Sequence, residues 1–208
     1  SSYAMFRGSL FILYEQASTD EDGIRMPNGS VRTYRESVHH QLLATMSNLW
    51  SLAENSDEMY RDFVADRRLM QSADSPYADV SYVVLPANNP TRMTTVAQKL
   101  LAQNIEVYAA ERDLDVRNVT DWTGRRFSSR TIPAGALVIP NRQPEARLIS
   151  AILEFDAAIS DETLARERRE RLRDGSSIMY DTTAWNLQMM YGLESWRVPD
   201  YLQSGLSA

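Results

Sequence analysis

Glu15 is the residue of this 208-residue sequence whose position points most directly to chemistry. It comes at the C-terminal end of an apolar run, residues 9–16, that is rich in strand-forming side chains, so we predict a buried strand there. Active sites of α/β proteins gather at the carboxyl ends of strands, where a carboxylate serves as a general base or acid. The alternative is a strand-end carboxylate that pairs with an arginine and has no catalytic role.

The two histidines, His39 and His40, are adjacent, and the chain has no cysteine. Neighbouring residues on a helix point about 100° apart, so these two imidazoles cannot both face one metal ion. The i,i+4 spacing that would place two histidines on one helix face is absent. We therefore predict a pair on a helix surface, no metal site in this chain, and no disulfide or thiol chemistry.

Arginines supply the remaining candidates. Arg125 and Arg126 lie near Trp122 and Phe127 and could form a pocket for an anion or a carboxylate; the alternative is a polar hairpin tip. Residues 161–174 are dense in arginine, but their acidic residues nearly cancel the charge, which indicates a solvated, self-paired helix. The net charge of −6 argues against nucleic acid as a partner, and no apolar run is long enough to span a membrane.

The elements that would position these residues fall into two parts. Thr33 and Glu36 have capping-box spacing, and the helix that they begin is expected to run to about Glu54. Its apolar residues recur every three or four positions, which predicts a buried face made of Val38, Leu42, Met46 and Leu49. A second, polar helix is expected over 55–72, and a linker over 72–76 marks a domain boundary.

After this linker the pattern changes to alternating strands and helices. A strand at 80–86, a helix that begins near Pro90 and a strand at 105–109 predict a βαβ unit with a right-handed crossover. The further elements expected are a small hairpin within 111–131, a strand at 136–140, and helices at 144–153, 161–174 and 182–191. Gly175 is expected to stop the second of these helices.

Several stretches resemble a known family. Residues 13–17, Leu-Tyr-Glu-Gln-Ala, and residues 33–41 resemble the end of the catalytic domain of bacterial zinc carboxypeptidases of the carboxypeptidase A-like family. Residues 132–140, 143–144 and 178–185 resemble the extension of large bacterial members, which is similar to class I glutamine amidotransferase-like α/β domains.

This resemblance implies roles for residues inside and outside the chain. It implies that Glu15 is the general base that activates a zinc-bound water for attack on a peptide carbonyl. It places the zinc ligands, a His-x-x-Glu pair and a later histidine, upstream of this sequence, so His39 and His40 are not ligands. The amidotransferase-like part has no cysteine nucleophile and is expected to be a non-catalytic accessory domain. A periplasmic or extracellular location is also suggested by the resemblance.

We therefore expect an α/β chain that is part of a longer polypeptide. Residues 1–72 would be the end of a carboxypeptidase-like mixed-sheet domain, and residues 75–208 a Rossmann-like or flavodoxin-like three-layer α/β domain. The intact protein is expected to hydrolyse peptide or peptidoglycan-like amide bonds, with the upstream peptidase segment and a peptide substrate as partners. The chain alone is expected to be inactive. The alternative is a non-catalytic binding or assembly module of a degenerate peptidase.

Overall fold

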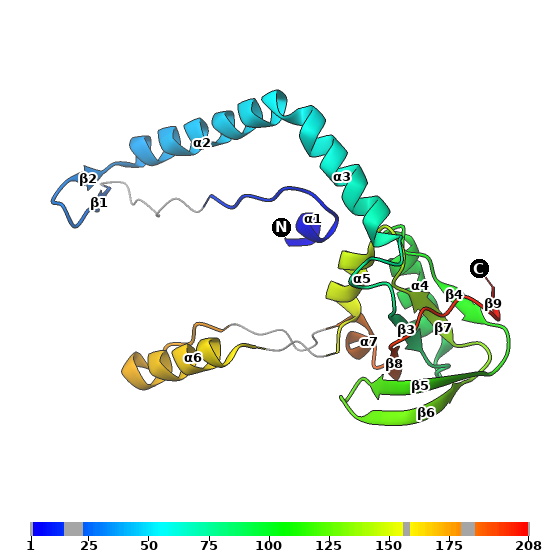
Figure 1. Cartoon of the computed structure of the whole chain (residues 1–208). Coiled ribbons are helices and arrows are strands. Elements are labelled where there is room, and N and C mark those ends of the chain that lie inside the picture. The colour runs from blue at the N-terminus through cyan, green and yellow to red at the C-terminus, as the bar shows by residue number, and fades with distance from the viewer. Residues whose placement is uncertain (1, 15–22, 156–158, 180–185, 208) are drawn as a thin grey trace. The chain divides into compact units, whose positions relative to one another are not determined.

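The structure is a computed structural model that describes residues 2–14, 23–155, 159–179 and 186–207. Figure 1 shows its helices and strands in chain order. The chain divides into two compact units, Ser1–Asp66 and Arg67–Ala208. Each unit is described by itself below.

The first unit is mostly helical. A tight turn over Pro27-Asn28-Gly29-Ser30 joins its two short strands, and Gly29 has the left-handed φ of 86° that such a turn requires. The elements of this unit are α1 (Ser2–Phe6), β1 (Ile24–Arg25), β2 (Val31–Arg32), α2 (Tyr34–Glu54) and α3 (Ser56–Met70), which continues into the second unit.

The predicted start of α2 is confirmed in detail. The Glu36 amide donates to Thr33 Oγ1 at 3.2 Å, and Glu36 Oε2 accepts from the Thr33 amide at 2.8 Å. This reciprocal pair is a capping box, which satisfies donors that the first helical turn leaves unpaired. Hydrogen bonds from Thr33 hold the pKa of the Glu36 carboxyl below its ordinary value.

The apolar stripe of α2 is exposed rather than buried. Val38, Leu42, Met46 and Leu49 are between 50% and 56% exposed, so the prediction that this face packs in a core is wrong for the chain by itself. Residues 9–14 form no strand, and Leu10 and Ile12 in this segment are more than half exposed. The periodicity of the sequence predicts that one helix face is apolar, but it does not identify the residues that would cover this face.

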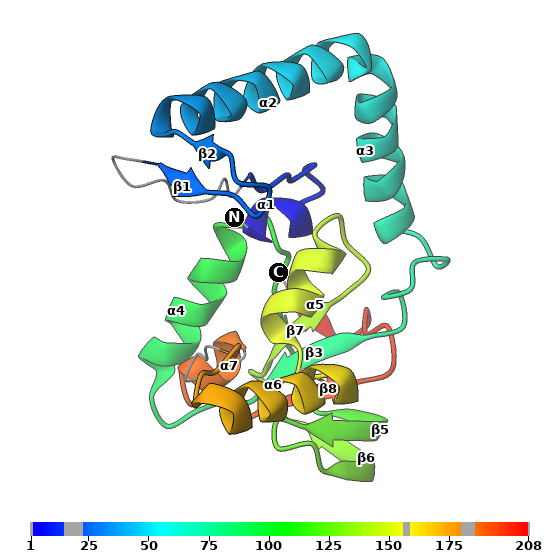
Figure 2. The ribbon, with the colours of Figure 1, turned by 90° about the vertical axis from the view of Figure 1, so that its left-hand side faces the viewer.

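The second unit is built on one seven-stranded sheet with the order β6-β5-β8-β3-β7-β4-β9. Three helices, α4, α5 and α7, cover one face of this sheet (Figures 1 and 2). The strands are β3 (Ser81–Val84), β4 (Tyr108–Ala110), β5 (Leu114–Asp121), β6 (Arg126–Ile132), β7 (Leu137–Pro140), β8 (Ser195–Val198) and β9 (Leu206–Ser207). The helices are α4 (Pro90–Leu101), α5 (Ala146–Leu153), α6 (Asp161–Asp174) and α7 (Leu187–Met190).

The mixed α/β class is confirmed, but the Rossmann-like or flavodoxin-like arrangement is not. Every neighbouring pair of strands in the sheet is antiparallel. A doubly wound sheet requires parallel neighbours. The predicted strand–helix–strand unit exists as β3, α4 and β4, and its two strands do run in the same direction. However, β7 lies between them and pairs antiparallel with both.

Two apolar clusters lie on the two faces of the sheet. On the helix face, Tyr82 of β3 and Ile139 of β7 belong to one cluster with Ile149 of α5. On the other face, Val83 and Val138 of the same two strands belong to a second cluster with residues of the curled β5–β6 hairpin. The alternation of β3 and β7 therefore sends successive side chains into two different cores.

Helix α6 has the predicted character. Its side chains are mostly exposed, it ends at Gly175 with a left-handed φ of 76°, and its charges pair within the helix. Arg171 Nε lies 2.6 Å from Glu167 Oε1, and Arg173 Nη2 lies 2.5 Å from Glu170 Oε2. Glu167 also accepts hydrogen bonds from Ser177 Oγ and from backbone amides after the helix, and these bonds lower its pKa.

Candidate functional site

The β5–β6 hairpin separates the four residues that the sequence suggested as one pocket. Side chains alternate between the two faces of a strand, so Arg125 and Phe127 lie towards one hollow while Trp122 and Arg126 line another. We call the first the Arg130 hollow, because Arg130 lines it beside Phe127, and the second the Arg126 hollow. The prediction of a polar hairpin tip is therefore confirmed, and the prediction of a single pocket lined by all four residues is wrong.

Asn118 sets which side chains of β5 face each hollow. Before it, Leu114 and Val116 are the buried residues, whereas after it Val119 and Asp121 are buried, so the alternation changes phase. Asn118 has a left-handed φ of 54°, which asparagine tolerates better than other residues with a side chain. Its residue type is the only sequence signal for this change.

Asp121 anchors the tip of the hairpin. Its buried Oδ1 accepts hydrogen bonds from the Thr123 amide at 2.9 Å, from Thr123 Oγ1 at 2.6 Å and from the Arg125 amide at 3.0 Å. Its Oδ2 lies 3.1 Å from Arg125 Nε. Burial by itself would raise the pKa of Asp121, but these hydrogen bonds from Thr123 and Arg125 lower it below its ordinary value.

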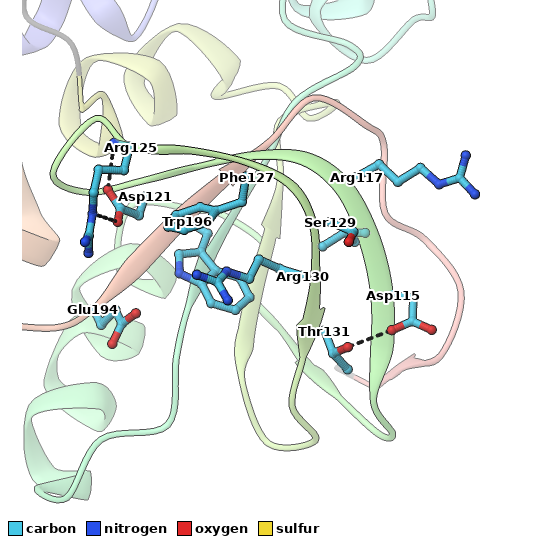
Figure 3. A pocket seen from close by; sticks show the side chains of 11 residues that line it. Asp115, Arg117, Asp121, Arg125, Phe127, Ser129, Arg130, Thr131, Glu194 and Trp196 are labelled. Atoms are coloured by element: carbon cyan, nitrogen blue, oxygen red, sulfur yellow. Dashed lines mark hydrogen bonds and ion pairs between the residues drawn. The ribbon is translucent and has the colours of Figure 1, made fainter.

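The Arg130 hollow has a volume of about 820 Å³ and combines arginine with aromatic rings (Figure 3). The Arg130 guanidinium lies 3.8 Å from the centroid of the Phe127 ring, and that of Arg125 lies 5.9 Å from it. Trp196 of β8 lies beside these groups and is 7% exposed. Stacking of a guanidinium on an aromatic face holds its N–H donors in a fixed plane.

The charges around the Arg130 hollow are balanced. Arg117 and Glu194 line it together with the residues above, and Asp115 accepts a hydrogen bond from Thr131 Oγ1 at 2.7 Å. The described lining therefore contains three arginines and three carboxylates, whose charges cancel. Such a hollow suits a polar, neutral or zwitterionic ligand better than a strong anion. Sequence reasoning missed Trp196 as a lining residue, because the short strand that carries it gives too few alternating positions to be recognised.

Glu15, the predicted general base, lies outside the described residues, as do residues 180–185 of the Tyr-Asp-Thr-Thr-Ala-Trp stretch. The backbone just before Glu15 is held to α2. Tyr14 O accepts a hydrogen bond from Gln41 Nε2 at 3.4 Å, and the Tyr14 hydroxyl accepts one from Asn48 Nδ2. This attachment places the end of the 9–14 segment beside α2.

His39 and His40 are both exposed on α2, as predicted for a surface pair. Within the described ranges, no three His, Cys, Asp or Glu side chains come together in a way that could hold a metal ion. The residues that the structure describes therefore do not fit a zinc centre. None of the helices in those ranges combines the length and apolar character that crossing a bilayer requires.

Comparison of the chain with protein-family models, with curated proteins and with solved structures found no match.

Proposed function

We propose that the chain is the C-terminal part of a zinc carboxypeptidase-like protein that hydrolyses peptide or peptidoglycan-like amide bonds. Glu15 is its general base, and residues 75–208 form an accessory α/β domain without a catalytic role. The upstream peptidase segment and a peptide substrate are its partners. The order of the resembling stretches carries this proposal: 13–17, then 33–41, then 132–140 and 178–185.

Two structural observations support the proposal. The capping box begins α2 at Thr33, inside the second resembling stretch, and Tyr14 next to Glu15 is hydrogen-bonded to that helix. The apolar stripe of α2 is half exposed, and a stripe of this kind is typical of a helix that packs against further apolar residues. The upstream peptidase segment would provide them.

In this proposal, Glu15 accepts the proton of the water that attacks the amide carbon and later passes it to the leaving nitrogen. Zinc would polarise that water, but its ligands would belong to the upstream segment. This chain would contribute the base and the helices that hold it.

Glu15→Gln in the full-length protein tests this role. Turnover should fall by about 10²–10⁴-fold, because general base catalysis contributes that much, while zinc stoichiometry and substrate binding stay unchanged. Glu54→Gln, at the exposed end of α2, is the matched control and should leave turnover unchanged. Unchanged turnover of the Glu15 variant, or peptidase activity of the 208-residue chain alone, would contradict the proposal.

A second candidate is a non-catalytic binding or assembly module of a degenerate peptidase. The specific observation in its favour is the Arg130 hollow, whose stacked Arg130–Phe127 pair and balanced charges suit recognition of a polar ligand such as a polysaccharide. In this case Glu15 is structural, and the Glu15→Gln protein should bind and behave like the wild type.

A further inference from the structure

The Arg126 hollow lies on the helix face of the sheet and has a volume of about 710 Å³. One row of directly opposed residues crosses the sheet beneath it. Thr120 of β5 is paired with Arg126 of β6 on one side and with Arg197 of β8 on the other, and Arg197 is paired with Tyr82 of β3. Residues directly opposite each other in neighbouring strands point to the same face. The two guanidiniums therefore rise from the same face, with a threonine between them.

The spacing of these arginines suits a small oxyanion. Adjacent strands lie about 4.8 Å apart, so the backbones of Arg126 and Arg197 are separated by about 10 Å, and two long flexible side chains can converge over Thr120. A guanidinium presents a planar fork of donors that matches a carboxylate. The Thr120 hydroxyl adds a donor at the centre of the row.

Neither arginine is neutralised by a carboxylate among the residues that the structure describes. In that part of the chain, the Arg126 side chain has no hydrogen-bond or ion-pair partner. Arg197 acts on the Tyr82 hydroxyl, whose pKa it lowers, but it has no ion pair with a carboxylate. Glu154 is the one carboxylate among the described residues that line the hollow. It accepts from the Phe155 amide at 2.7 Å and from the buried Tyr82 hydroxyl at 3.5 Å.

The charge balance selects among anions. Among the described residues of the lining, two arginines and one glutamate leave one net positive charge, in a chain whose own net charge is −6. A monoanion such as a carboxylate neutralises this charge, whereas a phosphate dianion overcompensates it next to Glu154.

Three apolar side chains of the remaining walls are available to a ligand, and two of them are held in place. Trp122, Phe155 and Met189 line the hollow. The Phe155 ring packs edge-on against Tyr82 with a centroid distance of 6.0 Å. The helix that carries Met189 is attached to the end of α5, because Gln188 Nε2 donates to Leu153 O at 3.2 Å. Burial, followed by the charge of Glu154, raises the pKa of Tyr82 to about 12, so the phenol that packs against Phe155 stays neutral.

We propose that the Arg126 hollow is a binding site for a carboxylate that carries an apolar side chain, such as a terminal amino-acid carboxylate. Arg126 and Arg197 bind the carboxylate together with Thr120, and Trp122, Phe155 and Met189 contact the apolar group. This site is independent of the proposed peptidase role of Glu15, and each can fail without the other.

Calorimetric titration of the full chain with N-acetyl-L-phenylalanine tests this site. The ligand should bind, whereas its neutral amide should not, and N-acetylglycine should bind more weakly because it lacks the apolar group. Phenyl phosphate, which is mostly a dianion at pH 7, should bind more weakly than the carboxylate. Equal binding of the amide, tighter binding of the phosphate, or no binding of any probe at millimolar concentration would overturn the proposal.

Variants locate the binding. Arg126→Gln and Arg197→Gln should each weaken binding of N-acetyl-L-phenylalanine by about tenfold to a hundredfold, because each removes a charged hydrogen-bond donor. Arg169→Gln, on the exposed surface of α6, makes the same charge change and should leave the affinity unaltered. Arg130→Gln tests the other hollow. A loss of affinity in Arg130→Gln but not in Arg126→Gln would assign the ligand to the Arg130 hollow and reject the proposal. Circular dichroism of each variant establishes that it is folded.

Discussion

Asp121 is a buried acceptor on which the tip of the β5–β6 hairpin depends. Replacing it by alanine removes an acceptor for four hydrogen bonds from Thr123 and Arg125. The released donors lie close to solvent, so we expect the free energy of unfolding to fall by about 1–2 kcal/mol at pH 7 rather than by the full cost of four lost bonds. Urea denaturation of Asp121→Ala and of the wild type measures this difference.

The pH dependence of this difference has a definite sign. The folded state lowers the pKa of Asp121, so its ionised form stabilises the fold above the ordinary carboxyl pKa and loses this effect as the pH falls. The gap between wild type and Asp121→Ala should therefore narrow between pH 7 and about pH 3. Asp121→Asn, which keeps an acceptor oxygen without the charge, should lie between the two proteins at pH 7. A gap that widens in acid would show that ionised Asp121 does not stabilise the hairpin.

The arginine and aromatic residues of the two hollows show what a sequence can reveal about a site. Arg125, Arg126, Trp122 and Phe127 stand out because charged and aromatic side chains crowd into six positions. The sequence does not reveal their partners, since Trp196 and its neighbours reach the same sheet from β8 across a long-range pairing. The hairpin could be recognised because its residues are close together in the chain. The other residues of each hollow come from distant strands, and the register of those strands decides which side chains line it.

Strand β5 depends on the backbone conformation of Asn118. Valine at this position would have to adopt a left-handed φ, which costs about 1–2 kcal/mol for a residue with a branched side chain. We expect Asn118→Val to lower the free energy of unfolding by that amount. Asn118→Gly, the control, should change it by less than about 1 kcal/mol because glycine adopts this conformation freely. Thermal and urea denaturation measure both variants, and equal stability of the two would contradict the role of the positive φ.

Elements with strong local signals agree with the sequence predictions. The capping box at Thr33 and the stop at Gly175 fix the ends of α2 and α6 through interactions within a few residues. The direction and order of strands are set by pairings such as Ser81 with Val198, more than a hundred residues apart. Local patterns contain no information on such pairings, which is why a parallel arrangement was predicted for an antiparallel sheet.

The two units of the molecule differ in how much they bury. Among the described residues of Ser1–Asp66, Ser37 is the one buried residue, whereas both apolar clusters and the whole seven-stranded sheet belong to Arg67–Ala208. Apolar burial is the main source of folding free energy. Residues 67–208 should therefore fold alone and account for the cooperative unfolding of the chain.

Scanning calorimetry of the full chain and of residues 67–208 tests this expectation. The two should have the same midpoint and the same unfolding enthalpy within error, because the first unit adds little buried apolar surface. A second cooperative transition, or a clearly larger enthalpy in the full chain, would mean that residues 1–66 form a core of their own.

The position of β3 between β7 and β8 has a consequence for how the protein is made. During synthesis β3 leaves the ribosome long before either of its neighbours, and β8, at Ser195–Val198, follows it by more than a hundred residues. Until these neighbours have been synthesised, both edges of β3 are unpaired, although all four of its residues are buried in the folded sheet. An unpaired apolar strand is a template for pairing with other chains. A nascent or prematurely terminated polypeptide that lacks β8 is thus prone to aggregate, and chaperones that retain it until β8 emerges would raise its yield.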